Sequence, residues 1–116
     1  MTDVFVTIPH PIVKEASSFT ATAYFRVAGA ASAPATNAKY RIDNLSTGSK
    51  VVDWTSLTPA VSISISITSA HNKILNNTNN FERLQLTVVS DRGETSANYG
   101  TVEWKVENVY GYTGNT

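Results

Sequence analysis

The chain has 116 residues, nine of them basic and nine acidic, and it contains no cysteine. This length suits a single domain over residues 1–116, and a domain of this size buries enough surface to fold without a metal ion or a disulfide. The lack of cysteine excludes thiolate metal sites and a disulfide framework, and the net charge of zero excludes the basic footprint typical of nucleic-acid-binding proteins.

The first predicted element is a short strand over residues 3–8, which stops at Pro9-His10-Pro11. Proline cannot donate a backbone hydrogen bond to a strand ladder and is confined to sheet edges and breaks. We therefore expect this strand either to lie at a sheet edge or to switch sheets at the prolines.

Six further strands are predicted by the alternation of apolar and polar residues, the period of a strand with one face on a core and one in water. They cover residues 18–27, 38–45, 50–54, 61–68, 83–90 and 101–109. The clearest is 61–68, where a valine and three isoleucines alternate strictly with serines. The residues predicted to face the core are Phe19, Ala21, Ala23, Phe25, Val27, Tyr40, Ile42, Val61, Ile63, Ile65, Ile67, Leu84, Leu86, Val88, Val102, Trp104 and Val106.

The segments between these strands have the composition of loops and turns. Residues 28–37 are small and unpatterned, which favours a surface loop, and residues 46–49 and 91–94 contain the glycines and polar residues of tight turns. The asparagine-rich segment 69–80 is predicted as a loop with room for one helical turn at residues 71–75.

Seven strands with a turn signal about every ten residues predict an all-β fold, a two-sheet antiparallel sandwich. Its largest core side chains would be Trp104 and Tyr40. The N-terminus has neither the positive charge nor the apolar stretch of a secretory signal. No apolar run approaches the roughly 20 residues that cross a bilayer. We therefore expect no signal peptide and no membrane partner.

Residue types that carry chemistry are present but not in patterns that predict an active site. His10 and His71 lie in separate loops without metal-ligand spacing. Glu103 and Glu107 flank Lys105 on an outward face, which is typical of a solvated surface. We therefore expect no metal ion and no cofactor.

Two aspartates and the many serines are the remaining candidates for catalytic side chains. Asp43 and Asp53 flank a predicted hairpin and could meet across it, where stabilising the turn is the favoured role. The chain has no G-x-S-x-G sequence that would present a nucleophilic serine on a strained turn, and no G-x-G-x-x-G sequence. We therefore expect no catalytic residue and a protein that is not an enzyme.

The C-terminal segment is the main candidate for a contact with another chain. Its two tyrosines stand between glycines beyond the last inward-facing residue, and tyrosine is enriched at interfaces. We expect ordered terminal arms, with the C-terminal segment and the first strand held by a neighbouring chain. The residues assigned to this contact are Val109, Tyr110, Tyr112, Pro9, His10 and Pro11.

The stretch Tyr-Arg-Ile-Asp-Asn-Leu-Ser-Thr-Gly at 40–48, continuing to Val-Asp-Trp-Thr at 52–55, resembles an immunoglobulin-like or fibronectin type III-like module. Together with residues 6–11, 14–26, 63–68, 83–90 and 104–110, it is also similar to small proteins encoded among the virion genes of tailed bacteriophages. One departure is that Tyr40 stands where such sandwiches usually carry a strand-C tryptophan.

The resemblance implies a single immunoglobulin-like β-sandwich and a non-enzymatic virion structural protein. Such a protein would bind in multiple copies, as a capsid decoration or cement protein or as a head–tail accessory of the neck or tail. The partners implied are the major capsid protein or neck and tail proteins of the same virion, with a homo-oligomer within the assembly as a further possibility. The location implied is the virion, after synthesis in the bacterial host cytoplasm.

The alternative function is a carbohydrate-binding or host-surface-binding module, since β-sandwiches bind glycans through exposed aromatic side chains. Trp54 and Tyr24 are the candidates for this role. A Trp54 exposed on a sheet would favour it, and a Trp54 packed between the sheets would exclude it.

Overall fold

The computed structural model describes residues 2–109, and within that range the chain forms nine β-strands. The expected strands are all present, with shifted ends, and two short strands, β2 and β4, were not predicted. The bounds are β1 Asp3–Thr7, β2 Ile12–Lys14, β3 Phe19–Val27, β4 Ala30–Ala31, β5 Ala38–Asn44, β6 Ser49–Leu57, β7 Ser62–Ile67, β8 Phe81–Ser90 and β9 Asn98–Glu107.

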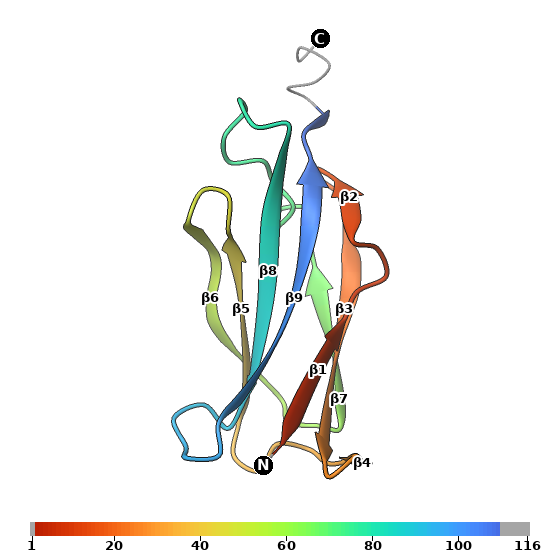
Figure 1. Cartoon of the computed structure of the whole chain (residues 1–116), viewed down its shortest axis with the longest axis vertical. Coiled ribbons are helices and arrows are strands. Elements are labelled where there is room, and N and C mark those ends of the chain that lie inside the picture. The colour runs from red at the N-terminus through yellow and green to blue at the C-terminus, as the bar shows by residue number, and fades with distance from the viewer. Residues whose placement is uncertain (1, 110–116) are drawn as a thin grey trace.

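The strands form two sheets that enclose one core (Figure 1). In the first sheet β3 is central, with β1 on one side and β7 and the short β4 as its other partners. The second sheet has the order β2-β9-β8-β5-β6. Every pairing is antiparallel except that of β2 with β9. The predicted all-β fold with two mostly antiparallel sheets is therefore confirmed.

The N-terminal segment changes sheets at its prolines. Residues of β1 pair with β3, with Val4 opposite Phe25. After Pro9-His10-Pro11 the chain pairs in parallel with β9, with Ile12 opposite Lys105. The expectation that the first strand lies at an edge or switches sheets is confirmed, because β1 is an edge strand and its continuation joins the other sheet.

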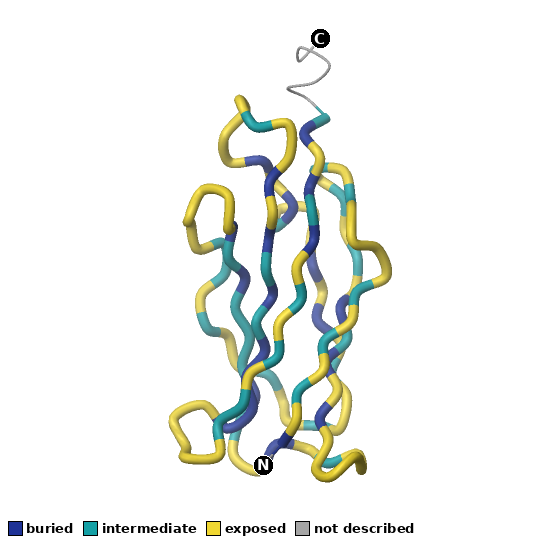
Figure 2. Tube along the Cα trace, in the orientation of Figure 1, coloured by how far each residue is buried: buried dark blue, intermediate teal, exposed yellow. Residues whose placement is uncertain are grey.

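The core follows the predicted alternation, and Figure 2 shows buried and exposed positions alternating along the strands. Trp104 is buried as expected, with only 2 % of its surface exposed. Three predictions need correction. Val27 and Val61 are exposed, because Val27 stands at the start of the β3–β4 hairpin turn and Val61 precedes β7. Tyr40 is only partly buried at the margin of the core.

One predicted loop contains the short strand β4, and the other is a loop as expected but lacks the helical turn. A hairpin turn with positive φ angles at Ala28 (51°) and Gly29 (84°) brings β4 back against β3, a turn in which glycine is favoured. The segment 69–80 contains no helical element at residues 71–75. A turn closes there instead, where the His71 N–H donates to the Thr68 carbonyl at 3.0 Å.

A buried carboxylate fixes the loop before β8. Glu82 is fully buried and accepts four hydrogen bonds of 2.7–3.0 Å, from the backbone N–H groups of Leu75 and Asn76 and the side-chain amides of Asn44 and Asn79. Burial acts to raise the pKa of this carboxyl, but the four hydrogen bonds outweigh it and lower the pKa below its ordinary value of 4.5. The anionic form therefore holds the loop in place.

A second buried polar group connects the same loop to the core. The Trp104 indole Nε1–H donates to Asn72 Oδ1 at 2.8 Å, and the Asn72 amide donates to the Ser17 carbonyl at 2.8 Å. The Trp104 ring also meets the Phe19 ring edge-to-face, with centroids 5.3 Å apart. The largest core side chain is thus linked to residues of both sheets.

Replacing Gly100 by alanine is expected to destabilise the contact between β1 and β9. A Cβ atom at this position would lie 2.6 Å from the Val4 carbonyl oxygen, which is backbone and cannot rotate away. We expect the free energy of unfolding to fall by about 1–3 kcal/mol, measured by urea denaturation. The exposed neighbour Thr101, replaced by alanine, should change stability by only about 0.5 kcal/mol. Equal stability of G100A and wild type would show that β1 does not lie so close to β9.

Candidate interaction surfaces

Two of the contact residues expected from the sequence, Pro11 and Val109, lie along the β2–β9 pairing. The Pro11 carbonyl accepts a hydrogen bond from the Lys105 N–H at 2.9 Å, and the Val109 N–H donates to Glu15 Oε1 at 2.8 Å. Pro9 and His10 are exposed on the connection between β1 and β2. Tyr110 and Tyr112 lie outside the described residues. The structure therefore brings Pro11 and Val109 to one seam, at opposite ends of β2.

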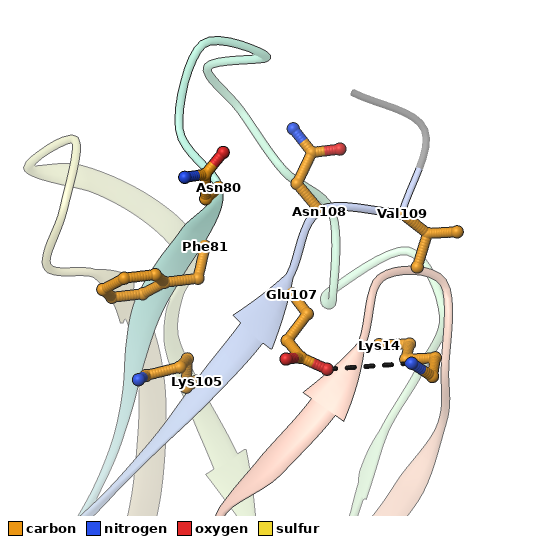
Figure 3. A pocket seen from close by; sticks show the side chains of 7 residues that line it. All are labelled: Lys14, Asn80, Phe81, Lys105, Glu107, Asn108 and Val109. Carbon is orange, nitrogen blue, oxygen red and sulfur yellow. Dashed lines mark ion pairs between the residues drawn. The ribbon is translucent and has the colours of Figure 1, made fainter. Parts of the chain in front are cut away.

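A hollow of about 410 Å³ lies at the end of this seam, and we call it the tip hollow (Figure 3). Lys105 Nζ lies 4.2 Å from the centre of the Phe81 ring, and Lys14 Nζ lies 3.8 Å from Glu107 Oε1. The hollow therefore combines an exposed aromatic ring with charges of both signs. Its lining residues are Lys14, Asn80, Phe81, Lys105, Glu107, Asn108 and Val109.

Trp54 lies on the outer face of the five-stranded sheet and not between the sheets. The Arg92 guanidinium carbon is 4.6 Å from the centre of the Trp54 ring, and that of Arg41 is 5.5 Å away. The ring of Tyr99, from β9, lies 6.5 Å from Trp54, centre to centre. We call these four residues the aromatic–arginine patch. They come from β6, β5, β9 and the turn after β8, so only the folded sheet brings them together.

Next to Tyr99 of the aromatic–arginine patch lies a buried apolar residue outside the main core. Val89 on β8 is paired with Tyr99 and is fully buried although it faces outward, away from the residues of the core. Arg41 donates two hydrogen bonds to the Asp43 carboxylate, and this interaction is the main cause that raises the pKa of Arg41. Arg92 forms no ion pair with any residue between 2 and 109. The patch thus presents aromatic rings and an uncompensated cation.

A second apolar hollow, of about 360 Å³, lies on the outer face of the other sheet and is lined by Phe5, Tyr24, Arg26 and Gly29. Phe5 on β1 is directly opposite Tyr24 on β3, and their exposed fractions are 51 % and 37 %. We call it the Phe5–Tyr24 hollow. Because it and the aromatic–arginine patch are on opposite outer faces, Trp54 and Tyr24 cannot line one site.

The two aspartates considered for catalysis both form ion pairs in the structure. Asp43 pairs with Arg41 at 2.6 Å and Asp53 with Lys50 at 3.3 Å. A hydrogen bond from the Trp54 backbone is the main cause that lowers the pKa of Asp53.

The two histidines are also apart, each in its own loop. His71 Nδ1 accepts a hydrogen bond from the Thr68 N–H at 3.0 Å, and burial lowers the pKa of its imidazole. No group of three potential metal ligands occurs among residues 2–109. No helix in that range is long and apolar enough to cross a membrane.

Sequence reasoning found Trp54 and Tyr24 but not their neighbours. Arg92 lies in the predicted turn 91–94, and the sequence did not mark Arg41 as a neighbour of Trp54. Phe5 had a usable signal, because Val4 and Val6 on either side of it take the inward positions of β1. An aromatic residue in the outward register of a short strand indicates a surface patch.

Comparison with known proteins gives no relative: no model of a protein family matches the sequence, and no curated protein matches it.

Proposed function

We propose that this protein is an immunoglobulin-like structural component of a tailed-phage virion that binds neighbouring proteins in many copies. The strand order supports the immunoglobulin-like assignment. Strands β1, β3 and β7 face a sheet with β5, β8 and β9 side by side, and the N-terminal segment contributes to both sheets. Immunoglobulin-type sandwiches divide their strands between two sheets in this way. The sequence resemblance to small virion proteins supports the phage assignment.

The observation that carries the assembly role is the pair of exposed aromatic patches on opposite outer faces. Tryptophan, tyrosine and arginine are the residues that contribute most binding energy at protein interfaces, and they make up the aromatic–arginine patch. The Phe5–Tyr24 hollow gives the other face an apolar contact area. A module with a contact on each face can join two neighbours. In a lattice, many individually weak contacts add to a strong attachment.

Sedimentation with phage particles tests this function. Purified protein is mixed with heads and, separately, with tails from a phage whose gene for this chain has been deleted, and the bound copies are counted by mass spectrometry. Hundreds of copies on heads would identify a capsid decoration protein. A small fixed number at the neck or tail would identify a joint component. Binding to neither particle would contradict the proposal.

Removing either aromatic patch is expected to weaken attachment without unfolding the protein. Trp54→Ala and Phe5→Ala should each reduce binding about tenfold or more, because both remove an aromatic contact at an interface. The matched controls are Ser56→Ala and Thr7→Ala, which lie two residues along on the same strand faces. Unchanged affinity in both aromatic variants would show that the patches are not the contact surfaces.

One observation favours the second candidate function, a carbohydrate-binding or host-surface-binding module. Trp54 is partly exposed on an outer sheet face, with Arg92 against its ring. Aromatic faces of this kind stack on sugars, and an arginine would suit an acidic sugar. Retention on immobilised acidic glycans that is lost in Trp54→Ala, combined with no binding to heads or tails, would favour this function over the structural one.

A further inference from the structure

The free edge of β7 differs from the other sheet edges of the molecule. Residues Ser62–Ile67 pair with β3 on one side, and no strand pairs with their other side within residues 2–109. An open edge exposes unpaired backbone N–H and C=O groups, with which a strand of another chain can pair. Natural proteins protect such edges with charges, prolines, bulges or very short strands. Strand β7 has none of these features.

The other edges are protected. Edge strand β6 carries Lys50 and Asp53, and its pairing with β5 contains register shifts. Edge strand β2 has only three residues, and β1 carries Asp3 and is followed by Pro9. Strand β7 is therefore an edge strand without these protective features.

The hydrogen bonding of β3 shows which β7 groups point outward. The Phe25 N–H donates to the Val61 carbonyl at 3.0 Å. In an antiparallel ladder the hydrogen-bonded pairs alternate, so the backbone groups of Ile63, Ile65 and Ile67 point toward β3. The N–H and C=O groups of Ser62, Ser64 and Ser66 therefore point toward the open edge.

We propose that two copies of this chain associate by antiparallel pairing of their β7 strands about a two-fold axis at Ser64. In this register Ser64 faces Ser64 of the second copy and Ser62 faces Ser66, so every outward backbone group finds a partner. Serines meet serines on the outer face, and Ile63 meets Ile65 on the core face. A slip of one residue would place serine opposite isoleucine on every pair.

The sequence of β7 favours a second copy of this chain as the partner at its open edge. A two-fold contact requires a surface that complements itself, and the uncharged Ser-Ile alternation over residues 62–66 reads the same in both directions. Because β7 carries no charged residue, the paired strands themselves would bring no like charges together. Ile63 is only partly buried in one copy, and the neighbouring strand would cover it further. This inference does not depend on the virion role.

Charge substitutions test the pairing and its register together. The variant with Ser62→Lys and Ser66→Lys places four lysines opposite one another and should abolish the dimer in sedimentation equilibrium. The matched variant with Ser62→Lys and Ser66→Glu places lysine opposite glutamate and should retain it. Both substitutions lie on the exposed outer face, and thermal unfolding checks that both variants fold. Equal dimerisation of the two variants would overturn the proposal, as would a monomeric wild type at about 1 mM.

A disulfide test avoids reliance on charge. The chain has no cysteine, so Ser64→Cys introduces a single thiol whose counterpart lies directly across the axis. Opposed residues in a hydrogen-bonded pair have Cα atoms about 5.5 Å apart, within the range of a disulfide. Ser64→Cys should form a covalent dimer on mild oxidation. Ser62→Cys lies on the same edge, but in this register it faces Ser66 of the second copy, four positions away from the second copy's residue 62. It should therefore form no disulfide. Cross-linking of both to the same extent, or of neither, would overturn the register.

Discussion

Replacing Glu82 by alanine is expected to lower the free energy of unfolding by about 3–5 kcal/mol. The substitution removes four hydrogen bonds to a carboxylate and leaves the N–H groups of Leu75 and Asn76 and the amides of Asn44 and Asn79 without this acceptor. Urea denaturation followed by circular dichroism measures the loss. Glu103→Ala is the matched control, because Glu103 pairs with Arg83 at the surface and should cost less than about 1 kcal/mol.

The same carboxylate predicts how stability depends on pH. The pKa of Glu82 is lowered in the folded protein, so the unfolded chain binds a proton more readily. The stability from this group is therefore fully present above the unfolded pKa of about 4.5 and is lost as the pH falls through the lower, folded value. Wild type should lose more stability than Glu82→Gln over this acidic range. Parallel pH curves for the two proteins would contradict the buried anionic form.

Replacing Trp104 by alanine is expected to be equally damaging, with a loss of about 3–5 kcal/mol. The change removes the largest core side chain, its edge-to-face contact with Phe19 and its hydrogen bond to the buried Asn72. Trp104→Phe should keep most of the packing and lose about 1–2 kcal/mol, because Asn72 Oδ1 is left without its donor.

The second tryptophan provides the control for this prediction. Trp54→Ala removes a partly exposed side chain from the outer face of the sheet, and it should cost about 1 kcal/mol. Both variants are measured by chemical denaturation with circular dichroism, since each removes one of the two tryptophans that fluorescence would report. A larger loss in Trp54→Ala than in Trp104→Ala would contradict the assignment of core and surface.

The strands and their inward faces could be predicted because successive side chains of a strand point to opposite faces. Alternation of apolar and polar residues therefore indicates which side chains share a face. Ile63, Ile65 and Ile67 illustrate this, since all three pack on the core. The two missed strands lack that signal. The three residues of β2 are too few for a period, and the two alanines of β4 have no polar partner residues to alternate with.

The buried carboxylate of Glu82 could not be predicted from local sequence. The predicted strand began at Arg83, which left Glu82 in the loop, although the inward positions Leu84 and Leu86 place Glu82 on the core face when extended backward. Burying a carboxylate is costly unless hydrogen-bond donors surround it, so a glutamate on a core face argues against the strand assignment when those donors are not known. Those donors come from β5 and from the loop before β8, which only the folded chain brings together.

The candidate surfaces were predictable only in part, for the same reason. Trp54 is visible in the sequence as an aromatic residue in a hairpin strand, but its neighbours Arg41, Arg92 and Tyr99 come from three other segments. The contact assigned to Tyr110 and Tyr112 stays a prediction, since those residues lie outside the described range. The contact assigned to Pro11 and Val109 also stays a prediction, although the chain places both residues at the β2–β9 seam.

The most direct test of the proposed virion role is quantitative mass spectrometry of purified particles from the phage that encodes this chain. The account predicts that the protein co-purifies with intact particles through a density gradient, at a fixed ratio to the major capsid protein. A protein that is abundant in infected cells but missing from the purified particles would contradict it.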